Sequence, residues 1–401
     1  MNVVAPLNTD TATPVGTRAV DPMRGTSSGI VSRQWMSRSR DQRFLSLNDL
    51  HDSVMARFRE AHETRAETRR LEFLAPANPT TIEETHDLWI GLPDGTEVAP
   101  SNWSFGQLAQ LAKAPAAYLK TLPTQIVADA LNYGMRFNRG VEALKAYHTK
   151  AELLAATGPD YGRIFDHEVV AAVQQIAGNG VGDTRWKVPG VMDWQTLRYN
   201  PDAPVTLDST TLYASDRDVF IFLVDDRNPI EIGRLANGEP DLIFRGFIIT
   251  NSEVGKSALK LISFYLRGVC QNRCLWGIEQ FEEITMRHSK YAPSRFMEEA
   301  RPALLSYAEG STASIVQGVE RARAAQIADT QEGALAFLQA RNFSRAKAQT
   351  ILDLHEREEG RPARSAWDFA QALTADARSI QFTDERFEQE LVAKRILDAV
   401  A

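Results

Sequence analysis

The stretch DVFIFLVDDRNPIEIGRLANGEPDLIFRGFIIT, residues 218–250, decides the fold predicted for this chain. Its apolar runs are short and rich in β-branched and aromatic residues, and an Asp-Arg-Asn-Pro and an Asn-Gly turn signal separate them. This pattern predicts antiparallel strands joined by turns. Upstream, WQTLRY (194–199) and VTLDSTTLY (205–213) have the same character, so we expect a meander of strands that begins near Thr184.

Helical patterns follow the predicted sheet to the end of the sequence. From about Pro293, apolar residues recur at helical spacing in six stretches, which Gly310, Asn342, Gly360 and Pro362 punctuate. Helices that follow a run of antiparallel strands, instead of alternating with them, indicate an α+β architecture.

The region before the sheet is also predicted to be mainly helical. Between Leu47 and about Leu74, apolar residues at helical spacing lead into alternating acids and bases, which predicts one helix. The segment HDLWIGLPDGTEVAP (86–100) predicts a small hairpin around a Pro-Asp-Gly turn. After it, Ser104 and Gln107 have the spacing of a capping box, and two prolines divide the following stretch into short helices.

The first 44 residues are predicted to form a mobile arm. They are rich in Thr, Ser, Pro, Gly and Arg and have few large aliphatic side chains, so they cannot bury enough surface to offset the entropy of the chain. The complete prediction is an α+β protein with a central antiparallel sheet. Its four segments are a disordered arm (1–44), a helical amino-terminal region with a small hairpin (45–150), an α+β core domain (151–292) and a helical carboxy-terminal region (293–401).

Composition excludes several classes of protein. Of the 401 residues, 43% are hydrophobic and 24% are charged, which is typical of globular proteins and unlike collagen or wholly disordered chains. The apolar runs fall well short of the ~18 residues that cross a bilayer, so we expect no association with a membrane. Two cysteines cannot form a disulfide framework, and they fit a reducing cytoplasm. The net charge of −7 argues against a protein with cations over its whole surface, but it allows a local basic region.

Two short stretches after residue 250 resemble a known family. The first is Asn-Ser-Glu-x-Gly at the end of a predicted strand, and the second is Cys-x-Asn. The residues that carry the pattern are Asn251, Ser252, Glu253, Gly255, Cys270 and Asn272. The pattern resembles the phage- and plasmid-encoded family called domain of unknown function 932, although Arg273 stands where the family has Gly. The resemblance implies a gene of mobile elements whose product acts in the cytoplasm of a bacterial host cell, and it implies no activity.

Two ligand-binding patterns are incomplete. The Gly-Lys-Ser sequence at 255–257 has the order of a phosphate-binding loop, but Thr250 stands where that loop needs a glycine. Cys270 and Cys274 supply only two of the four ligands of a closed zinc site. We therefore expect no resident metal or cofactor.

A metal-dependent nuclease stays open as an alternative. A Pro-Asp pair at 240–241 is followed by Glu253 and Lys256, which is close to a known nuclease pattern. In a strand, however, residues three apart point to opposite faces, so the pattern is broken unless the chain bulges. Asp225 and Asp226 are the other candidate Mg²⁺ ligands.

The segment 245–295 carries the strongest signal for a ligand. Its eight basic residues outnumber its four acidic residues, an excess of +4 in a chain whose net charge is −7. Cations interleaved with aromatic rings are what binding of single-stranded nucleic acid requires. The competing interpretation places the rings in the core and the basic side chains in solvent. The predicted nucleic-acid-binding residues are Lys256, Lys260, Arg267, Arg273, Tyr265, Trp276, Arg287 and Lys290.

We therefore expect a non-catalytic nucleic-acid-binding protein of a phage or plasmid, which holds single-stranded DNA during recombination or replication. Its cations would contact phosphates, and Tyr265 or Trp276 would stack on a base. Two alternatives are a protein-interaction or host-modulating factor acting through the carboxy-terminal helices, and the metal-dependent nuclease. The sequence is compatible with a homo-oligomer.

Overall fold

The computed structural model describes most of the chain after residue 39. The described residues are 40–77, 87–137, 142–193, 198–207, 209–234, 238, 240–267, 273–274, 283–310, 313–377, 379–380 and 383–400. They form two compact units. Unit 1 comprises residues 58–161, and unit 2 comprises residues 40–57 and 162–400. Each unit has its own sheet and its own hydrophobic core.

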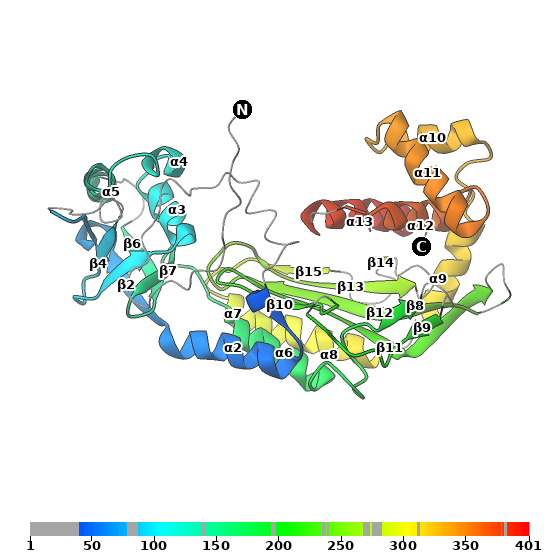
Figure 1. The fold of residues 1–401 in the computed structure, drawn as a ribbon, viewed down its shortest axis with the longest axis horizontal. Coiled ribbons are helices and arrows are strands. Elements are labelled where there is room, and N and C mark those ends of the chain that lie inside the picture. The colour runs from blue at the N-terminus through cyan, green and yellow to red at the C-terminus, as the bar shows by residue number, and fades with distance from the viewer. Residues whose placement is uncertain are drawn as a thin grey trace, which may run out of the picture. The chain divides into compact units, whose positions relative to one another are not determined.

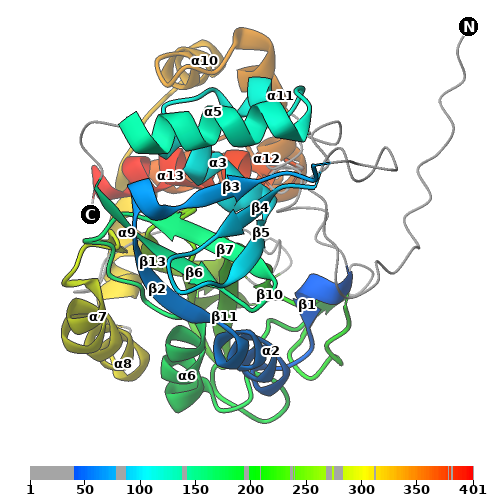
Figure 2. The same ribbon diagram turned by 90° about the vertical axis from the view of Figure 1, so that its left-hand side faces the viewer.

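Unit 1 is a six-stranded sheet with helices packed on it (Figure 2). The strand order is β2-β6-β7-β5-β4-β3, and all neighbours are antiparallel except β5 and β7. The core between sheet and helices includes Phe105, Leu131 and Leu144. The bounds are β2 His62–Glu67, β3 Glu72–Leu74, β4 Trp89–Gly91, β5 Glu97–Pro100, α3 Asn102–Leu111, α4 Ala116–Leu119, α5 Thr124–Phe137, β6 Ala143–His148 and β7 Glu152–Thr157.

Two local predictions for this unit are confirmed. The hairpin forms between β4 and β5, where Ile90 pairs with Val98 and Gly95 has a φ of 86° in the turn. The short helices are also present, because α4 begins just after Pro115 and α5 just after Pro123.

Two other predictions for this region were wrong. The helix that begins at Leu47 ends at Glu60 instead of continuing to Leu74, and β2 and β3 follow it. Alternating charges suit an exposed strand as well as a helix, and β2 finds a partner in β6, with which it pairs over its whole length. The capping residue is Ser101, whose side chain accepts a hydrogen bond from the Ser104 amide at 3.1 Å. The region predicted as helical, 45–150, therefore contains most of a sheet.

Unit 2 is built on a seven-stranded antiparallel sheet, which confirms the predicted α+β class. The order is β1-β10-β11-β12-β13-β14, and β15 also pairs with β13. A separate two-stranded ribbon consists of β8 and β9. The bounds are β1 Arg43–Phe44, β8 Val191–Asp193, β9 Arg198–Asn200, β10 Leu212–Ala214, β11 Val219–Arg234, β12 Pro240–Asn251, β13 Leu259–Arg267, β14 Arg273–Cys274 and β15 Glu283–Met286.

The stretch that decided the fold forms two long strands instead of three short ones. β11 runs through the Asp-Arg-Asn-Pro signal, and its pairing with β12 is irregular between Asp225 and Ile230. The Asn228 side chain donates a 2.7 Å hydrogen bond to Asp225 across this irregularity. The turn signal therefore produces a bulge within one strand.

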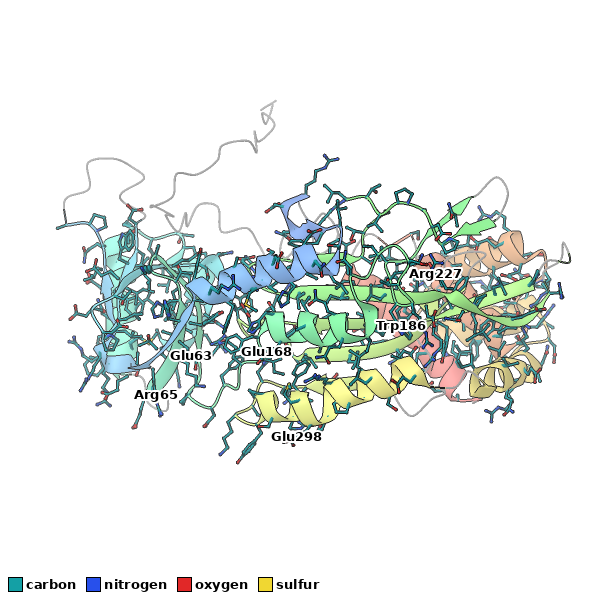
Figure 3. All side chains as sticks on the ribbon, turned by 90° about the horizontal axis from the view of Figure 1, so that it is seen from below. Glu63, Arg65, Glu168, Trp186, Arg227 and Glu298 are labelled. Atoms are coloured by element: carbon teal, nitrogen blue, oxygen red, sulfur yellow. The ribbon has the colours of Figure 1, made fainter. Side chains whose placement is uncertain are left out.

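Helices lie on both faces of this sheet. Figure 1 shows α2, α6 and α8 on one side and α12 and α13 on the other, and Figure 3 shows the first three side by side. On the first side, Trp186 packs against Phe247 and Tyr307 in the main core. The six helical stretches predicted from Pro293 onward are confirmed. The bounds are α2 Leu47–Glu60, α6 Asp166–Ala177, α7 Ala292–Arg295, a π-helical turn Phe296–Ala300, α8 Arg301–Glu309, α9 Ala313–Ala324, α10 Gln331–Gln339, α11 Arg345–Glu359, α12 Ala366–Ala377 and α13 Thr383–Asp398.

Only the last five residues of the predicted arm, 40–44, are among the described residues. Residues 1–39 lie outside the described residues, whereas 40–44, assigned to the arm, form a 3₁₀ turn and β1. Arg43 donates a 2.9 Å hydrogen bond to the Leu207 carbonyl, and β1 pairs with β10. Within the described part of the chain, no helix combines the length and apolar character that crossing a membrane demands.

Candidate functional site

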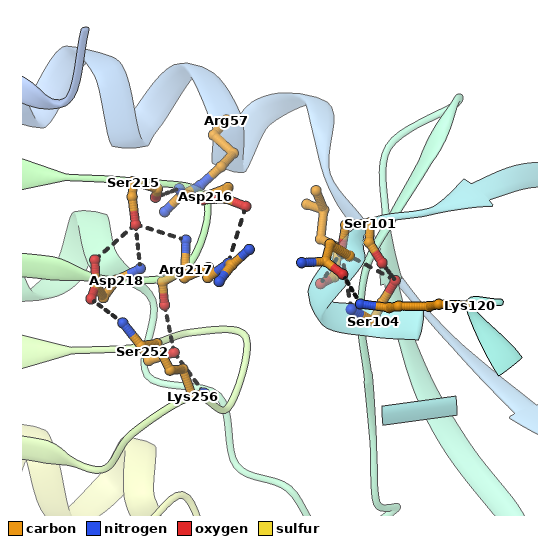
Figure 4. A network of polar contacts seen from close by, with 12 residues as sticks. Arg57, Ser101, Ser104, Lys120, Ser215, Asp216, Arg217, Asp218, Ser252 and Lys256 are labelled. Atoms are coloured by element: carbon orange, nitrogen blue, oxygen red, sulfur yellow. Dashed lines mark hydrogen bonds and ion pairs between the residues drawn. The ribbon is translucent and has the colours of Figure 1, made fainter. Parts of the chain in front are cut away.

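The Asn-Ser-Glu-x-Gly stretch forms a buried turn at the end of β12. Ser252 donates a 2.6 Å hydrogen bond to the Arg217 carbonyl and accepts one of 2.9 Å from the Lys256 amide (Figure 4). Gly255 has a φ of 86°, which a residue with a Cβ adopts only with strain. The motif therefore ends a strand, as predicted, and it also caps the segment that follows and favours glycine at position 255.

The motif also holds the start of α6. Asn251 is fully buried, and its amide donates 2.8 Å hydrogen bonds to the Asp166 carboxylate and to the Ile164 carbonyl. The Asp166 amide in turn donates to the Glu253 carboxylate at 3.0 Å. Two residues of the motif therefore bind the first turn of a helix whose sequence position is far from theirs.

One arginine forms ion pairs with two buried carboxylates in this cluster. The Arg57 guanidinium lies 2.6 Å from Asp166 and 3.0 Å from Glu253, and it also donates to the Ser215 carbonyl. Burial raises the pKa of the Asp166 carboxyl well above its usual range, and the nearby charge of Glu253 raises it further, while Arg57 opposes both effects. The cluster, in which both carboxylates are buried, joins three segments of the chain.

A histidine at the edge of the cluster is held neutral. His288 lies with its Nδ1 atom 3.2 Å from the Gly162 carbonyl oxygen. Burial lowers the pKa of His288 to about 4, and the neighbouring Arg163 charge contributes to the same direction. Arg163 itself is buried and donates to the Glu253 carbonyl.

The predicted basic residues do not all meet at one surface. Lys256 lies 3.1 Å from the buried Asp218 carboxylate, which also accepts a 2.8 Å hydrogen bond from Ser215 (Figure 4). Arg245, counted in the local charge excess, is buried and donates to the carbonyls of Tyr307 and Gly310. Positive charges at these two positions are therefore used inside unit 2.

The predicted stacking rings are not available as expected. Tyr265 is only 2% exposed and belongs to a core cluster with Ile243, so it has no face open to a base and this expectation needs correction. Trp276 lies outside the described residues. Arg267 and Arg273 lie in β13 and β14, and their side chains are outside the described part.

Three of the predicted residues do reach the surface or its margin. Lys260 is half-buried in β13, where it pairs with Thr285 of β15. Arg287 and Lys290 are exposed just beyond β15. Next to them, Tyr291 is 61% exposed, and the Lys290 ammonium lies 4.9 Å from its ring centroid. Sequence reasoning missed Tyr291, although its position directly after Lys290 was a usable signal.

The carboxylates of the nuclease alternative are buried and each lies beside a cation. Arg185 lies 2.7 Å from Asp225, Lys187 lies 3.6 Å from Asp226, and Arg323 lies 2.9 Å from Asp241. Asp241 lies near the start of β12 and Glu253 lies in the turn after its end, and the strand between Asp241 and Asn251 spans ~33 Å. In the part of the chain that the structure describes, no three or more His, Cys, Asp or Glu side chains are grouped to hold a metal.

Comparison with known protein families gives a match in the second half of the chain. Residues 200–389 match the model of a family described as a domain of unknown function (DUF932). This region contains the Asn-Ser-Glu-x-Gly turn and most of the helices after it, and all of it lies in unit 2. No curated protein and no solved structure matches the chain.

Proposed function

Since residues 200–389 match the model of the DUF932 family, whose description names no activity, we propose a function from the side chains: the protein binds single-stranded nucleic acid and performs no chemistry on it. The proposed setting is the cytoplasm of a bacterial host, on a gene of phage or plasmid origin, because the motif resemblance is to genes of that kind. Single strands arise there during recombination and replication.

The observation that carries the proposal is a group of exposed side chains in segment 287–291. Within five residues it presents Arg287, Lys290 and the largely exposed ring of Tyr291. Among the described residues, neither cation has a carboxylate at ion-pair distance. Lys256 and Arg245, by contrast, are bound inside the unit.

Cations and a ring at one place suit a single strand for a physical reason. Phosphates attract the cations and release their counterions on binding, and an unpaired base offers a flat face to an aromatic ring. The Lys290 ammonium lies over the Tyr291 ring, but a ring has two faces and one ammonium can cover only one. Duplex DNA has no exposed base faces, so the segment favours single strands.

Binding without catalysis is supported by the state of the acidic residues. The carboxylates of Asp166, Asp218 and Glu253 are buried and hold cations or backbone groups in place. A nucleophile, a general base or a metal ligand has to reach the substrate. These three side chains are buried and do not reach the surface. Their hydrogen bonds and ion pairs stabilise the turn after β12 and the start of α6.

A titration of the full chain into labelled single-stranded oligothymidine, followed by fluorescence anisotropy at low salt, tests the proposal. The variant R287E/K290E is expected to bind about tenfold more weakly, because two phosphate contacts become repulsive. The matched control is R321E/R357E, which reverses two other exposed arginines of unit 2 and changes the net charge equally. Equal affinities of the two variants, or no binding by the wild type, would refute the proposal.

A further inference from the structure

Unit 1 contains a groove that no pattern in the sequence predicted. It has a volume of about 370 Å³ and lies between the face of α5 and the segment from residue 68 to residue 74. At its edge are Tyr133 and Phe137, which are 69% and 60% exposed. Single exposed apolar side chains are common, but exposed apolar surface gathered at one place marks a contact site for a ligand or partner.

The two rings form one platform. They are four residues apart on α5, so they project from the same face of the helix, and their centroids are 4.7 Å apart with the planes inclined by 45°. Contact between the rings limits the rotamers of both, which lowers the entropy cost of holding a flat ligand against them.

The backbone under this platform is firmly held. The Asn132 side chain accepts a 2.9 Å hydrogen bond from the Phe73 amide and donates one of 2.8 Å to the Phe73 carbonyl. This pair of bonds fixes α5 to β3 along the groove. Leu131 and Met135 are buried on the opposite face of the helix. The groove is therefore pre-formed, as ligand sites usually are.

The charges along the groove favour an anion. Arg69, Arg70 and Arg136 line it, together with two acids, Glu72 and Asp129, which leaves an excess of one positive charge (three minus two). Arg70 also lies 3.3 Å from Glu67, but both side chains are more than 60% exposed, and such a pair contributes little. A phosphate can compete for this arginine.

We infer that this groove is a second contact site for single-stranded nucleic acid, in which a base stacks on Tyr133 or Phe137 and the neighbouring phosphates bind Arg69 and Arg136. The inference rests on the proposed function and adds to it a site outside the region that the family model covers. Stacking also explains why flat rings, and not aliphatic side chains, occupy the exposed face of α5 at these two positions.

The test compares two ligands and three variants of the full chain. The ligands are labelled oligothymidine and an abasic strand of the same length, which has the phosphates but no bases. The variant Y133A/F137A removes both rings, Y133F/F137Y retains both, and Y118A removes a ring of unit 1 that is 60% exposed but does not line the groove. All the changed side chains are exposed, so folding is expected to be unaffected.

Y133A/F137A is expected to lose at least about fivefold in affinity for oligothymidine, the low end for one base–aromatic stack, and less than about twofold for the abasic strand. Y133F/F137Y and Y118A are expected to bind like the wild type. An unchanged affinity of Y133A/F137A, or an equal loss on both strands, would overturn the inference. So would a change in molar mass by light scattering in Y133A/F137A alone, because the platform would then be a contact between copies of the chain.

The two proposals can fail separately. A wild type that binds no single strand overturns both. A wild type that binds, weakens with R287E/K290E and is unaffected by Y133A/F137A overturns only the second site.

Discussion

The backbone amide of Asp166 donates a 3.0 Å hydrogen bond to the carboxylate of Glu253, across a separation of 87 residues. This bond joins the first residue of α6 to the turn after β12, and Arg57 of α2 neutralises part of the charge on both side chains. Three segments that are distant in sequence therefore meet at the Asn-Ser-Glu-x-Gly motif. The resulting cluster accounts for the motif as a structural element of unit 2.

Loss of the arginine from this cluster is expected to be costly. R57A leaves two buried carboxylates without their shared cation, and we expect the free energy of unfolding to fall by about 3 to 5 kcal/mol. The matched control is R59A, on the same helix but exposed, for which a change below about 0.5 kcal/mol is expected. Urea denaturation followed by circular dichroism measures both. Similar stabilities of R57A and R59A would show that the cluster does not hold unit 2 together.

Stability should depend on pH through His288. Its folded-state pKa of about 4 lies below the ordinary value of 6.5, so between these values the unfolded chain takes up a proton that the folded chain does not. The native state therefore loses stability as pH falls from 6.5 toward 4, by at most about 3 kcal/mol. Asp166 acts in the opposite direction, because a raised carboxyl pKa stabilises the native state as pH falls.

The contribution of His288 can be isolated by difference. H288Q has no group that titrates at this position, so the stability of the wild type relative to H288Q is expected to decline between pH 6.5 and 4 and to level off below pH 4. Denaturation midpoints at several pH values give this difference. A difference that stays constant over the range would mean that the histidine is not held neutral in the folded protein.

Two glycines are expected to respond oppositely to alanine. A Cβ on Gly246, in the middle of β12, would lie 2.1 Å from the buried Phe264 ring, so G246A should destabilise unit 2 by about 1 to 3 kcal/mol or more. A Cβ on Gly106 meets nothing within 4 Å, and α3 gains helix propensity, so G106A should stabilise unit 1 by roughly 0.5 to 1 kcal/mol. Thermal denaturation of the two variants measures both changes. If G246A were as stable as the wild type, the strands could move apart at this position without cost.

The sequence predicted the class of the fold because local patterns were strong. The β-branched runs at 218–250 became β11 and β12, and helical spacing gave the six carboxy-terminal stretches. Two of the wrong predictions had a common cause, since a local signal was overridden by pairing with a distant strand. The charged segment of β2 pairs with β6, and β11 pairs with β12 on both sides of a turn signal. No local pattern contains the position of a partner strand.

The site was harder to predict for the same reason. The charged residues can be counted in the sequence, but the sequence does not show which of them are engaged inside the folded protein. Arg245 is buried and Lys256 forms an ion pair with Asp218. Tyr265 packs in a core cluster with residues of the carboxy-terminal helices, and this could be known only after those neighbours were known. In the cluster, Arg57 is 109 positions from Asp166, and Asp166 is 87 positions from Glu253. Contacts over such separations cannot be read from local patterns in one sequence.

The salt dependence of binding tests the central claim most directly. The logarithm of the association constant of the wild type for single-stranded oligothymidine should fall linearly with the logarithm of the salt concentration. The slope for R287E/K290E should be shallower by about 1.4, because each lost phosphate contact to a single strand removes ~0.7. The control R321E/R357E should keep the slope of the wild type. An identical slope for all three proteins, or binding by the wild type that salt does not weaken, would contradict nucleic-acid binding through Arg287 and Lys290.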